Sequence, residues 1–396
     1  MVKLLKKLYN EKRIPCAGGI VMKRILQLAA ALTAACILAG CNPGGRVEHR
    51  TLRVTNYGHT KTRFASLQKA VDKYNAEHPK IQYSIEFNHY MDGVWDWDSY
   101  TAMAEELLSQ NGQDDLITMP GEYIGKLAAE GYLLPLDDII EDAGFQEEYF
   151  APLLPKTEYL GHTWGLLIEM DMRTVYVNKN ILAKLGYSEG YVEQLPEGIR
   201  TGEITLTDLE EIGKEAVKQG LADFAMVHRP RYGTFFYGMA QQFHAFSIDE
   251  DGTVSFDEEN FAEMLRFYQR ISQLNKEPQP VEWSDVNDIF IQERAAVYMG
   301  ANWTIYDCVM ERGGDEETLL GQYAVGLLPA VHKDESPFAV SNTLQIIASA
   351  NCEDPEAVKE ILANAYSDWD ALAAHCAQSY RLPIAKSCLL YTSRCV

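Results

Sequence analysis

The chain has 396 residues, of which 47% are hydrophobic and 23% are charged, with 35 Lys and Arg against 57 Asp and Glu. A formal net charge of −22 gives a surface that repels nucleic acid and anionic lipid headgroups, so neither is an expected partner. The length exceeds that of one ordinary hydrophobic core and suits a globular protein of two lobes.

Residues 22–41 have the organisation of a secretion signal. The basic start Met22-Lys23-Arg24 is followed by an apolar run of 14 residues, 25–38, and then by small residues that end at Cys41. These features are typical of a bacterial lipoprotein signal peptide, whose cysteine receives the lipid. The alternative is a transmembrane helix, but that needs roughly 20 apolar residues. We therefore expect a monomer that is lipid-anchored through Cys41 at the extracytoplasmic face of the bacterial cell membrane.

Both ends of the chain carry segments that we interpret as additions. Residues 1–21 precede the signal, and Gly18-Gly19 lie just ahead of Met22, where a ribosome-binding site would be translated as glycine. We interpret residues 1–41 as a mis-called start followed by the signal peptide. The segment CLLYTSRCV at 388–396 resembles a translated sequencing adapter joined to its inverse, with an ordinary tail as the alternative. Natural sequence would then end near residue 387.

After a short linker at residues 42–50, strands and helices alternate. Buried or alternating apolar patterns predict three strands, at residues 51–56, 81–87 and 115–119. Apolar residues at helical spacing predict three helices, at residues 64–78, 99–110 and 123–130. Strands that alternate with helices favour a parallel sheet covered by helices.

Residues 164–178 form a long apolar segment with acids at Glu169 and Asp171, and we expect a strand that crosses between the lobes. Thr207 is the expected N-cap of a helix predicted at 207–219, because Glu210 follows it at capping-box spacing. The patterns downstream predict helices at 179–185, 207–219, 258–274 and 355–365, a hairpin at 247–256, and strands at 295–299, 323–328 and 343–348.

The hairpin segment has the acid spacing of a calcium loop, with Asp249, Asp251, Gly252 and Glu258 in register. Its first ligand would be Ser247 rather than Asp, and a strand rather than a helix precedes it. A hairpin turn followed by helix-capping acids explains the same residues. We therefore expect no metal here and no cofactor in the protein.

Three cysteines lie outside the signal and the last segment: Cys308, Cys352 and Cys376. An odd number without CxxC spacing argues against a disulfide framework or a zinc site. One disulfide bridge remains open as an alternative.

Several short segments occur along the chain in a characteristic order: LRV at 52–54, AVDKYNAEHP at 70–79, NGQDDLI at 111–117, GYLLPL at 131–136, VYVNK at 175–179, AAVYMGANW at 295–303 and VGLLP at 325–329. In this order they resemble the extracellular solute-binding proteins of the maltose-binding type. The sequence departs from the family pattern at Asp114, which replaces a proline, and at Glu293-Arg294, which replaces Gly-Lys.

The resemblance implies an α/β, two-lobed periplasmic-binding-protein-like fold of type II. It implies hinge strands between the lobes, a ligand bound in the cleft, closure on binding, and docking onto the permease subunits of an ABC importer. We expect the N-terminal lobe at 51–169 and 343–387 and the C-terminal lobe at 170–342. The family's last helices are absent, so the fold is expected to be C-terminally truncated.

A carbohydrate is the expected ligand, because 22 Tyr, 6 Trp and 14 Phe supply flat rings for the apolar faces of sugars. The resemblance implies that Trp303 stacks a sugar ring, with Asn302 beside it as a hydrogen-bonding group; the alternative is a Trp packed under the sheet. Asp171 matches by spacing the family's cleft acid, and Glu169 lies two residues back on the same face of the strand. The alternative for both acids is a solvated strand end.

Other candidate ligand contacts follow predicted strands or lie in loops. Tyr57 and His59 follow the first strand, and Glu122 and Tyr123 follow the third, at the edge where open sheets present ligand-binding groups. The alternative for these residues is ordinary loop surface. The remaining candidates are Trp95 and Trp97, one of which we expect to stack ligand, and Arg231 and Tyr232 in a loop of the second lobe.

Two other functions stay open at this point. A non-sugar ligand such as a peptide or polyamine is the first alternative. The second is a secreted glycoside hydrolase, for which Glu122, Glu169 or Asp171 would supply the paired carboxylates. The chain contains no nucleophile, metalloprotease or nucleotide-binding motif, so an enzyme would rest on acids alone, and we expect a binding protein.

Overall fold

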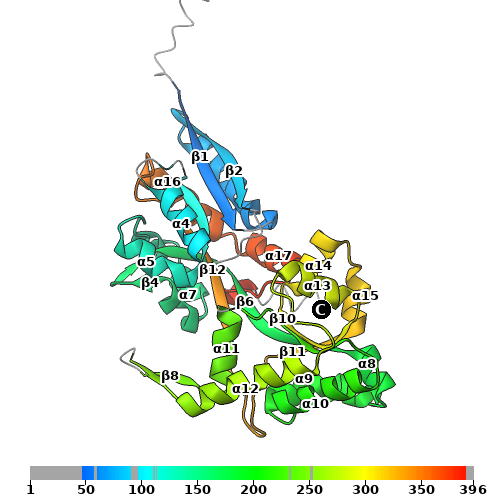
Figure 1. Ribbon diagram of the computed structural model, residues 1–396. Helices are drawn as coiled ribbons and strands as arrows, with labels where there is room; N and C mark the ends of the chain where they lie inside the picture. The colour runs from blue at the N-terminus through cyan, green and yellow to red at the C-terminus, as the bar shows by residue number, and fades with distance from the viewer. Residues whose placement is uncertain are drawn as a thin grey trace, which may run out of the picture. The chain divides into compact units, whose positions relative to one another are not determined.

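The computed structural model describes residues 47–57, 60–90, 97–109, 112, 114–231, 233–249 and 253–388, with only the backbone for 57, 89–90, 97–99 and 311 (Figure 1). The chain divides into two compact units. The smaller contains residues up to Arg50 and His78–Gln82, and in it the Glu48 N–H donates to the Lys80 carbonyl at 2.8 Å. The larger contains Thr51–Glu77 and Tyr83–Val396.

An eight-stranded sheet has the order β2-β1-β3-β12-β6-β10-β7, and β11 pairs with β6 outside this path. Two small hairpins, β4–β5 and β8–β9, stand apart from it. The strands are β1 (Glu48–Tyr57), β2 (Ile81–Tyr90), β3 (Leu116–Pro120), β4 (Glu158–Tyr159), β5 (His162–Thr163), β6 (Gly165–Asn178), β7 (Phe224–Val227), β8 (Phe246–Ile248), β9 (Val254–Phe256), β10 (Ala295–Ala301), β11 (Tyr323–Leu327) and β12 (Ser341–Ala348).

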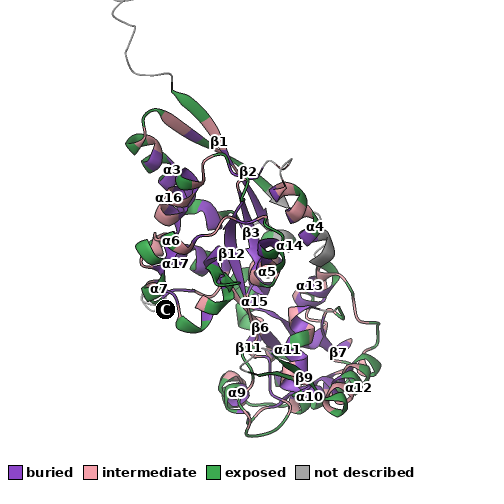
Figure 2. Cartoon of the chain, turned by 90° about the vertical axis from the view of Figure 1, so that its left-hand side faces the viewer, coloured by how far each residue is buried: buried purple, intermediate pink, exposed green. Residues whose placement is uncertain are grey.

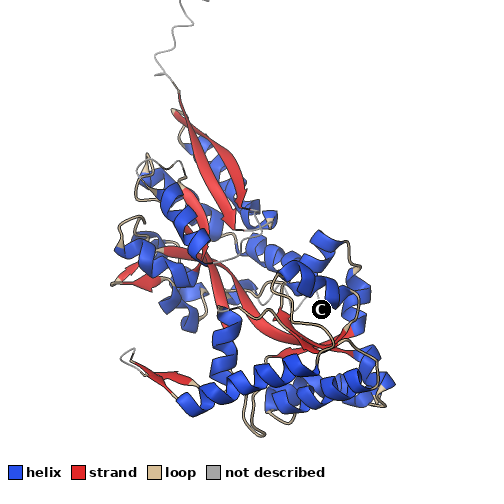
Figure 3. Cartoon of the chain, in the orientation of Figure 1, coloured by secondary structure: helices blue, strands red, loops and turns tan. Residues whose placement is uncertain are grey.

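Strand β6 runs through both halves of this sheet, as Figure 3 shows. Its residues up to Met172 pair with β12, whereas its residues from Arg173 onward pair with β10 and those from Thr174 with β11. We call β1, β2, β3, β12 and the start of β6 the first half, and β7, β10, β11 and the end of β6 the second half. The crossing strand predicted at 164–178 is therefore confirmed.

The expectation of a parallel sheet is wrong for the centre. The pairs β1–β3 and β7–β10 are parallel, but β12 is antiparallel to both β3 and β6, and β6 is antiparallel to β10 and β11. The physical reason lies in the connection: β6 leads the chain into the second half and β12 leads it back, so the two crossing strands must run in opposite directions.

The helices are α3 (Ala65–Glu77), α4 (Trp97–Leu108), α5 (Ile124–Ala129), α6 (Asp137–Asp142), α7 (Phe145–Glu148), α8 (Lys179–Lys184), α9 (Glu189–Thr201), α10 (Leu206–Lys218), α11 (Thr234–Gln242), α12 (Glu258–Leu274), α13 (Trp283–Ile291), α14 (Thr304–Arg312), α15 (Glu316–Gln322), α16 (Pro355–Tyr366) and α17 (Trp369–Ser379). Short 3₁₀ helices are η1 (Lys61–Phe64), η2 (Gly121–Tyr123) and η3 (Ala151–Lys156). The predicted helices correspond to α3, α4, α5, α8, α10, α12 and α16, and the predicted hairpin to β8–β9.

The predicted N-cap of α10 is wrong by two residues. Its N-cap is Thr205, whose Oγ1 accepts from the Asp208 N–H at 3.3 Å while the Asp208 carboxylate accepts from the Thr205 N–H at 2.9 Å. This is a complete capping box, formed by Thr205 and Asp208 rather than by Thr207 and Glu210. Glu210 is instead buried in an ion pair with Arg270 at 2.9 Å.

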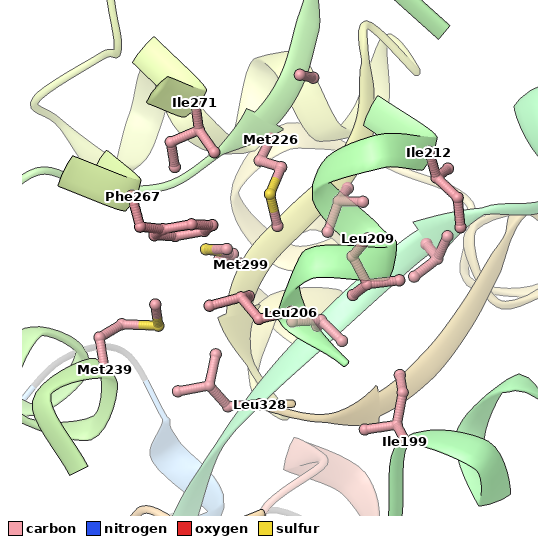
Figure 4. Packing of buried hydrophobic residues seen from close by; sticks show 14 of the residues in the cluster. Ile199, Leu206, Leu209, Ile212, Met226, Met239, Phe267, Ile271, Met299 and Leu328 are labelled. Atoms are coloured by element: carbon pink, nitrogen blue, oxygen red, sulfur yellow. The ribbon is translucent and has the colours of Figure 1, made fainter. Parts of the chain in front are cut away.

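Helices cover the second half of the sheet with two main hydrophobic clusters, one formed with α9–α12 and the other with α13–α15. Figure 4 shows Leu206 and Leu209 of α10, Met226 of β7, Met299 of β10 and Phe267 of α12 pointing toward one another. In Figure 2 the central strands are largely buried, whereas the outer faces of α9, α10 and α12 are exposed. Among the residues described, no helix is long and apolar enough to cross a membrane.

Candidate functional site

The middle of β6 brings together acids and cations from distant parts of the chain. Glu169 is only 1% exposed and accepts from Arg63 Nε at 3.0 Å and from Arg63 Nη2 at 2.5 Å. His375 Nε2 lies 2.5 Å from Glu169 Oε2, and Arg381 Nε lies 3.3 Å from Glu169 Oε1. Burial opposes ionisation, but Arg63, Arg381 and His375 together hold the pKa of Glu169 well below its usual range. The carboxylate is therefore ionised and fully occupied by protein groups.

His375 links this acid to η1. Burial lowers the pKa of His375, so its ring is neutral at pH 7. The neutral ring donates from Nε2 to Glu169 and accepts at Nδ1 from the Thr62 hydroxyl at 2.8 Å. The buried cluster thus contains two cations, Arg63 and Arg381, around one carboxylate.

Asp171 supplies the second carboxylate, two residues farther along β6. Its Oδ1 accepts from Arg381 Nη1 at 2.8 Å, and its side chain remains 24% exposed. Burial raises the pKa of Asp171, and the Arg381 guanidinium opposes that rise. In the part of the chain that is described, Oδ1 alone takes a hydrogen bond, which leaves Oδ2 to solvent.

Glu122 stands beside Asp171 because η2 follows β3 at the same point of the sheet. Asn342 is the register partner of Asp171 on β12, and its Nδ2 donates to Glu122 Oε1 at 3.1 Å. The Glu122 side chain is exposed, yet burial by the surrounding protein raises its pKa to about 7, with Arg173 opposing the rise. Glu122 and Asp171 thus lie close together, and the protein around Glu122 favours its protonated form.

Gly121 explains how the Glu122 turn approaches β12 so closely. A Cβ on Gly121 would lie 2.6 Å from Thr343 Oγ1, so a side chain there would push η2 off the strand. The neighbouring Tyr123 packs with its ring centroid 6.2 Å from that of Tyr100, whose hydroxyl donates to the Thr118 carbonyl. The structure therefore places Glu122 with Asp171, whereas Tyr123 packs toward α4.

Asn302 and Trp303 follow β10, and they contact β6 and the segment after α17. Asn302 Oδ1 accepts from the Met172 N–H at 2.8 Å, and its Nδ2 donates to the Tyr380 carbonyl at 2.5 Å. Trp303 is 9% exposed, and the Arg381 guanidinium lies 5.8 Å from its ring centroid. Asn302 thus holds β10 to β6, and Trp303 forms an inner wall of the site rather than a broad open plate.

A second tryptophan, Trp283 at the start of α13, lies against Trp303. The ring centroids are 5.1 Å apart and the planes meet at 83°, and Trp283 is only half-buried. The Arg229 guanidinium lies 5.7 Å from the Trp283 centroid. Arg231, a predicted contact, pairs with Glu282 beside Trp283 at 2.9 Å. The loop after β7 therefore reaches the same aromatic pair.

Five predicted residues cannot be placed with the others. His59, Trp95 and Tyr232 lie outside the described residues, and of Tyr57 and Trp97 only the backbone is described. Tyr57 is the last residue of β1 rather than the first after it, and Trp97 is the first residue of α4, which begins two residues earlier than predicted.

Sequence reasoning missed Arg63, Trp283, Asn342 and Arg381. Trp283 carried a usable signal, because it opens the helix that precedes the segment AAVYMGANW at 295–303. The other three carried none, because Arg63 and Arg381 are separated from Glu169 by 106 and 212 positions along the chain. No group of His, Cys, Asp or Glu in the described ranges has the arrangement of a metal site.

The chain matches one protein family over most of its length. The profile described as "Bacterial extracellular solute-binding protein" matches residues 58–368. No curated protein matches the sequence.

Solved structures show the fold more widely. The GacH receptor of Streptomyces glaucescens, solved unliganded and with acarbose, superposes with a TM-score of 0.67 at 17% identity over 88% of this chain and 83% of its own. Maltose-bound MalE3 of T. maritima gives 0.64 at 16% identity over 85% and 82%. The maltotriose-bound binding protein of Thermus thermophilus gives 0.64 at 14% identity over 87% and 84%. The fold is accordingly the two-lobed, type II arrangement expected from the sequence.

Proposed function

Because the chain belongs to the family of bacterial extracellular solute-binding proteins, we propose that it captures a carbohydrate outside the cell and delivers it to an ABC permease. The family consists of binding proteins, so the chain is not an enzyme, and the glycoside hydrolase considered from its acids is set aside. An oligosaccharide fits the proposal best, because the site offers two aromatic side chains, Trp283 and Trp303, in contact with each other.

The observation that carries the proposal is the pairing of charge at the crossing strand. Glu169 is neutralised by Arg63 and Arg381, Asp171 by Arg381, and Glu282 by Arg231. The site therefore presents hydrogen-bonding groups with little net charge, although the chain as a whole carries −22. Such a surface suits a neutral, hydroxyl-rich ligand, because the arginines that pair with Glu169, Asp171 and Glu282 oppose the binding of a polyamine at these acids.

The structural relatives support the same ligand class. GacH was solved with acarbose, MalE3 with maltose and the Thermus thermophilus protein with maltotriose. Each of these ligands is a sugar or a sugar analogue. The likeness itself concerns the fold, so the ligand of this chain remains our proposal.

Within the site, we assign Asp171 and Glu122 as acceptors for sugar hydroxyls, with Trp303 and Asn302 forming the opposite wall. Glu169 was expected to bind ligand, but its burial and three cationic or imidazole partners favour a supporting role. We keep Tyr57, His59, Trp95, Trp97, Tyr123, Arg231 and Tyr232 as predicted contacts of the same ligand.

The proposal includes the lobe boundaries and the anchor. We propose lobes that divide near 169–170 and 342–343, a few residues from the point after Met172 where β6 changes its partner strand. Lipidation at Cys41 is tested by labelling cells with a palmitate analogue. We expect the label on the protein with Cys41 and its loss from a Cys41→Ala variant, whereas label on both would exclude this anchor.

Binding is tested by thermal unfolding of the purified protein with a panel of mono- and oligosaccharides, spermidine and a mixed tripeptide library. We expect at least one oligosaccharide to raise Tm by several degrees, because a ligand at 100 times its Kd stabilises by about 2.7 kcal/mol. The ligand should be recovered intact by chromatography. A shift with spermidine or peptides alone would replace the carbohydrate with that class.

A further inference from the structure

Arg381 joins the two groups on which the proposed site depends, although they come from different halves of the sheet. Its Nη1 donates to Asp171 on β6 at 2.8 Å, and its guanidinium covers the ring of Trp303 after β10 at 5.8 Å. Its Nε also lies 3.3 Å from Glu169. One planar cation therefore contacts a carboxylate edge-on and an indole face-on, which a guanidinium does well and an ammonium does poorly.

The backbone around Arg381 is held as firmly as its side chain. The preceding Tyr380 has a left-handed φ of 56°, and its carbonyl accepts from Asn302. The following Leu382 exchanges two backbone hydrogen bonds with Met170, at 2.9 and 3.0 Å. The Arg381 N–H donates to the Cys376 carbonyl at 3.1 Å. The segment after α17 is thus fixed to both β6 and the loop after β10.

Exposure decides how Arg381 acts. Its side chain is 9% exposed, and its guanidinium already contacts Asp171 and the Trp303 ring, so little of it is left for a ligand to contact. Asp171 is 24% exposed and keeps Oδ2 toward solvent. Arg381 therefore approaches Asp171 from the protein side and leaves its Oδ2 to the ligand, while it covers the Trp303 ring that Trp283 contacts as well.

Resting on the carbohydrate-binding function proposed above, we propose that Arg381 is a positioning residue that sets the orientation of Asp171 and Trp303 and thereby the affinity for sugar. It acts through these two side chains and makes no contact with the ligand itself. Glu169 holds Arg381 in place and completes its pairing.

A change in the pKa of Asp171 would distinguish a positioning role of Arg381 from a purely structural one. The charged groups that face Asp171 are Arg381, Glu169, Arg173 and Arg63. Asp307 faces Arg381, Glu122 is the neighbouring acid that titrates near 7, and His375 is neutral at that pH. Arg381 is the largest contribution that opposes the rise in the pKa of Asp171. Removing its charge should therefore let the carboxyl hold its proton to higher pH.

The test uses Arg381→Met, which keeps the length of the side chain, and Arg381→Lys, which keeps the charge. Arg294→Met is the matched control, because Arg294 also pairs with an acid, Asp223 at 2.9 Å, and lies 5.6 Å from the Phe224 ring. Two readouts are needed: the Kd for the sugar found in the panel, measured from pH 6 to 8, and the carboxyl titration of Asp171 by ¹³C NMR without sugar.

We expect Arg381→Met to weaken sugar binding by about 10-fold or more, the range of a lost hydrogen bond to a charged group, and to shift the Asp171 titration to higher pH. Arg381→Lys should keep the Asp171 titration close to that of the wild type, because the positive charge remains. It should not keep the sugar affinity, because an ammonium does not stack on the Trp303 ring as a planar guanidinium does. Arg294→Met should change neither readout.

Unchanged affinity in Arg381→Met, or weaker binding with an unmoved Asp171 titration, would overturn the proposal. If Arg381→Met does not fold, Arg381→Lys alone decides, since wild-type affinity in that variant contradicts the role given to the guanidinium plane. If the wild-type protein binds no sugar, the carbohydrate function fails, while the ligand-free titration of Asp171 still tests the contact with Arg381.

Discussion

The Glu169 carboxylate accepts hydrogen bonds from both Nε and Nη2 of Arg63, and neither side chain is more than 3% exposed. A bidentate contact of this kind fixes the guanidinium and the carboxylate in one relative geometry. Arg63 lies in the 3₁₀ helix η1 after β1, and Glu169 lies in the crossing strand. The pair therefore holds the first half of the sheet to the strand that carries Asp171.

Glu169→Gln should destabilise the protein by about 3–5 kcal/mol at pH 7, because Arg63 and Arg381 would lose a buried carboxylate partner. The measurement is chemical unfolding followed by circular dichroism. Glu335→Gln is the control, since Glu335 pairs with His244 in a contact that is 43% exposed on the acid side. Equal stability of the two variants would contradict the role assigned to Glu169.

The N-terminus of α10 offers a test of a residue that sequence spacing located wrongly. Thr205→Ala should cost about 1 kcal/mol, because it removes the acceptor for the Asp208 N–H. Thr207→Ala should be nearly neutral, because Thr207 is exposed and lies inside the helix. Urea unfolding of both variants checks this order, and the opposite order would return the cap to Thr207.

Local patterns predicted the fold more successfully than the site. Apolar periodicity located the crossing strand and most long helices, because strand and helix spacing are visible in a short window. It placed Asp171 in the crossing strand and Glu122 directly after the third strand, but it did not predict that the two lie together. It could not pair Arg63 or Arg381 with Glu169, since those contacts depend on the folded chain and leave no local pattern.

One departure from the family pattern has a physical explanation. Glu293, where the family has glycine, adopts a left-handed φ of 54°. Its carboxylate accepts from Asn178 and Asn180 Nδ2 at 3.2 and 2.7 Å and from Gln322 Nε2 at 2.8 Å. Hydrogen bonds from these three amide groups offset the free-energy cost of about 1–2 kcal/mol that a non-glycine residue has at a left-handed φ. A substitution that looks damaging in sequence is thus compensated by neighbours from β6, α8 and α15.

Glu122 should make stability depend on pH. Its pKa is about 7 in the folded protein against a usual value of 4.5, so between these values the folded state binds more protons than the unfolded state. Stability therefore falls as pH rises from about 4.5 to 7. Glu122→Gln should lose this dependence and gain Tm relative to wild type at pH 8 but not at pH 4.

The matched control for this pH effect is Glu317→Gln, an exposed glutamate on α15. Thermal unfolding at pH 4, 6 and 8 should show a Tm difference from wild type that grows with pH for Glu122→Gln only. A constant difference across the series would mean that the pKa of Glu122 is the same in the folded and the unfolded protein, which would contradict the raised value.

The two tryptophans should separate stability from binding. Trp303→Ala should abolish sugar affinity and also cost about 3–5 kcal/mol, since this ring is 9% exposed. Trp164→Ala, on a ring that is also 9% exposed but packs in the first half of the sheet, should cost similar stability and leave affinity unchanged. Trp283→Ala, on a half-buried ring, should lose affinity with a much smaller loss of stability.

Calorimetry and chemical unfolding of the three variants give both quantities. Undiminished sugar binding by Trp303→Ala would show that the indole belongs to the core alone, and the same result for Trp283→Ala would confine the ligand to the side of Asp171 and Glu122.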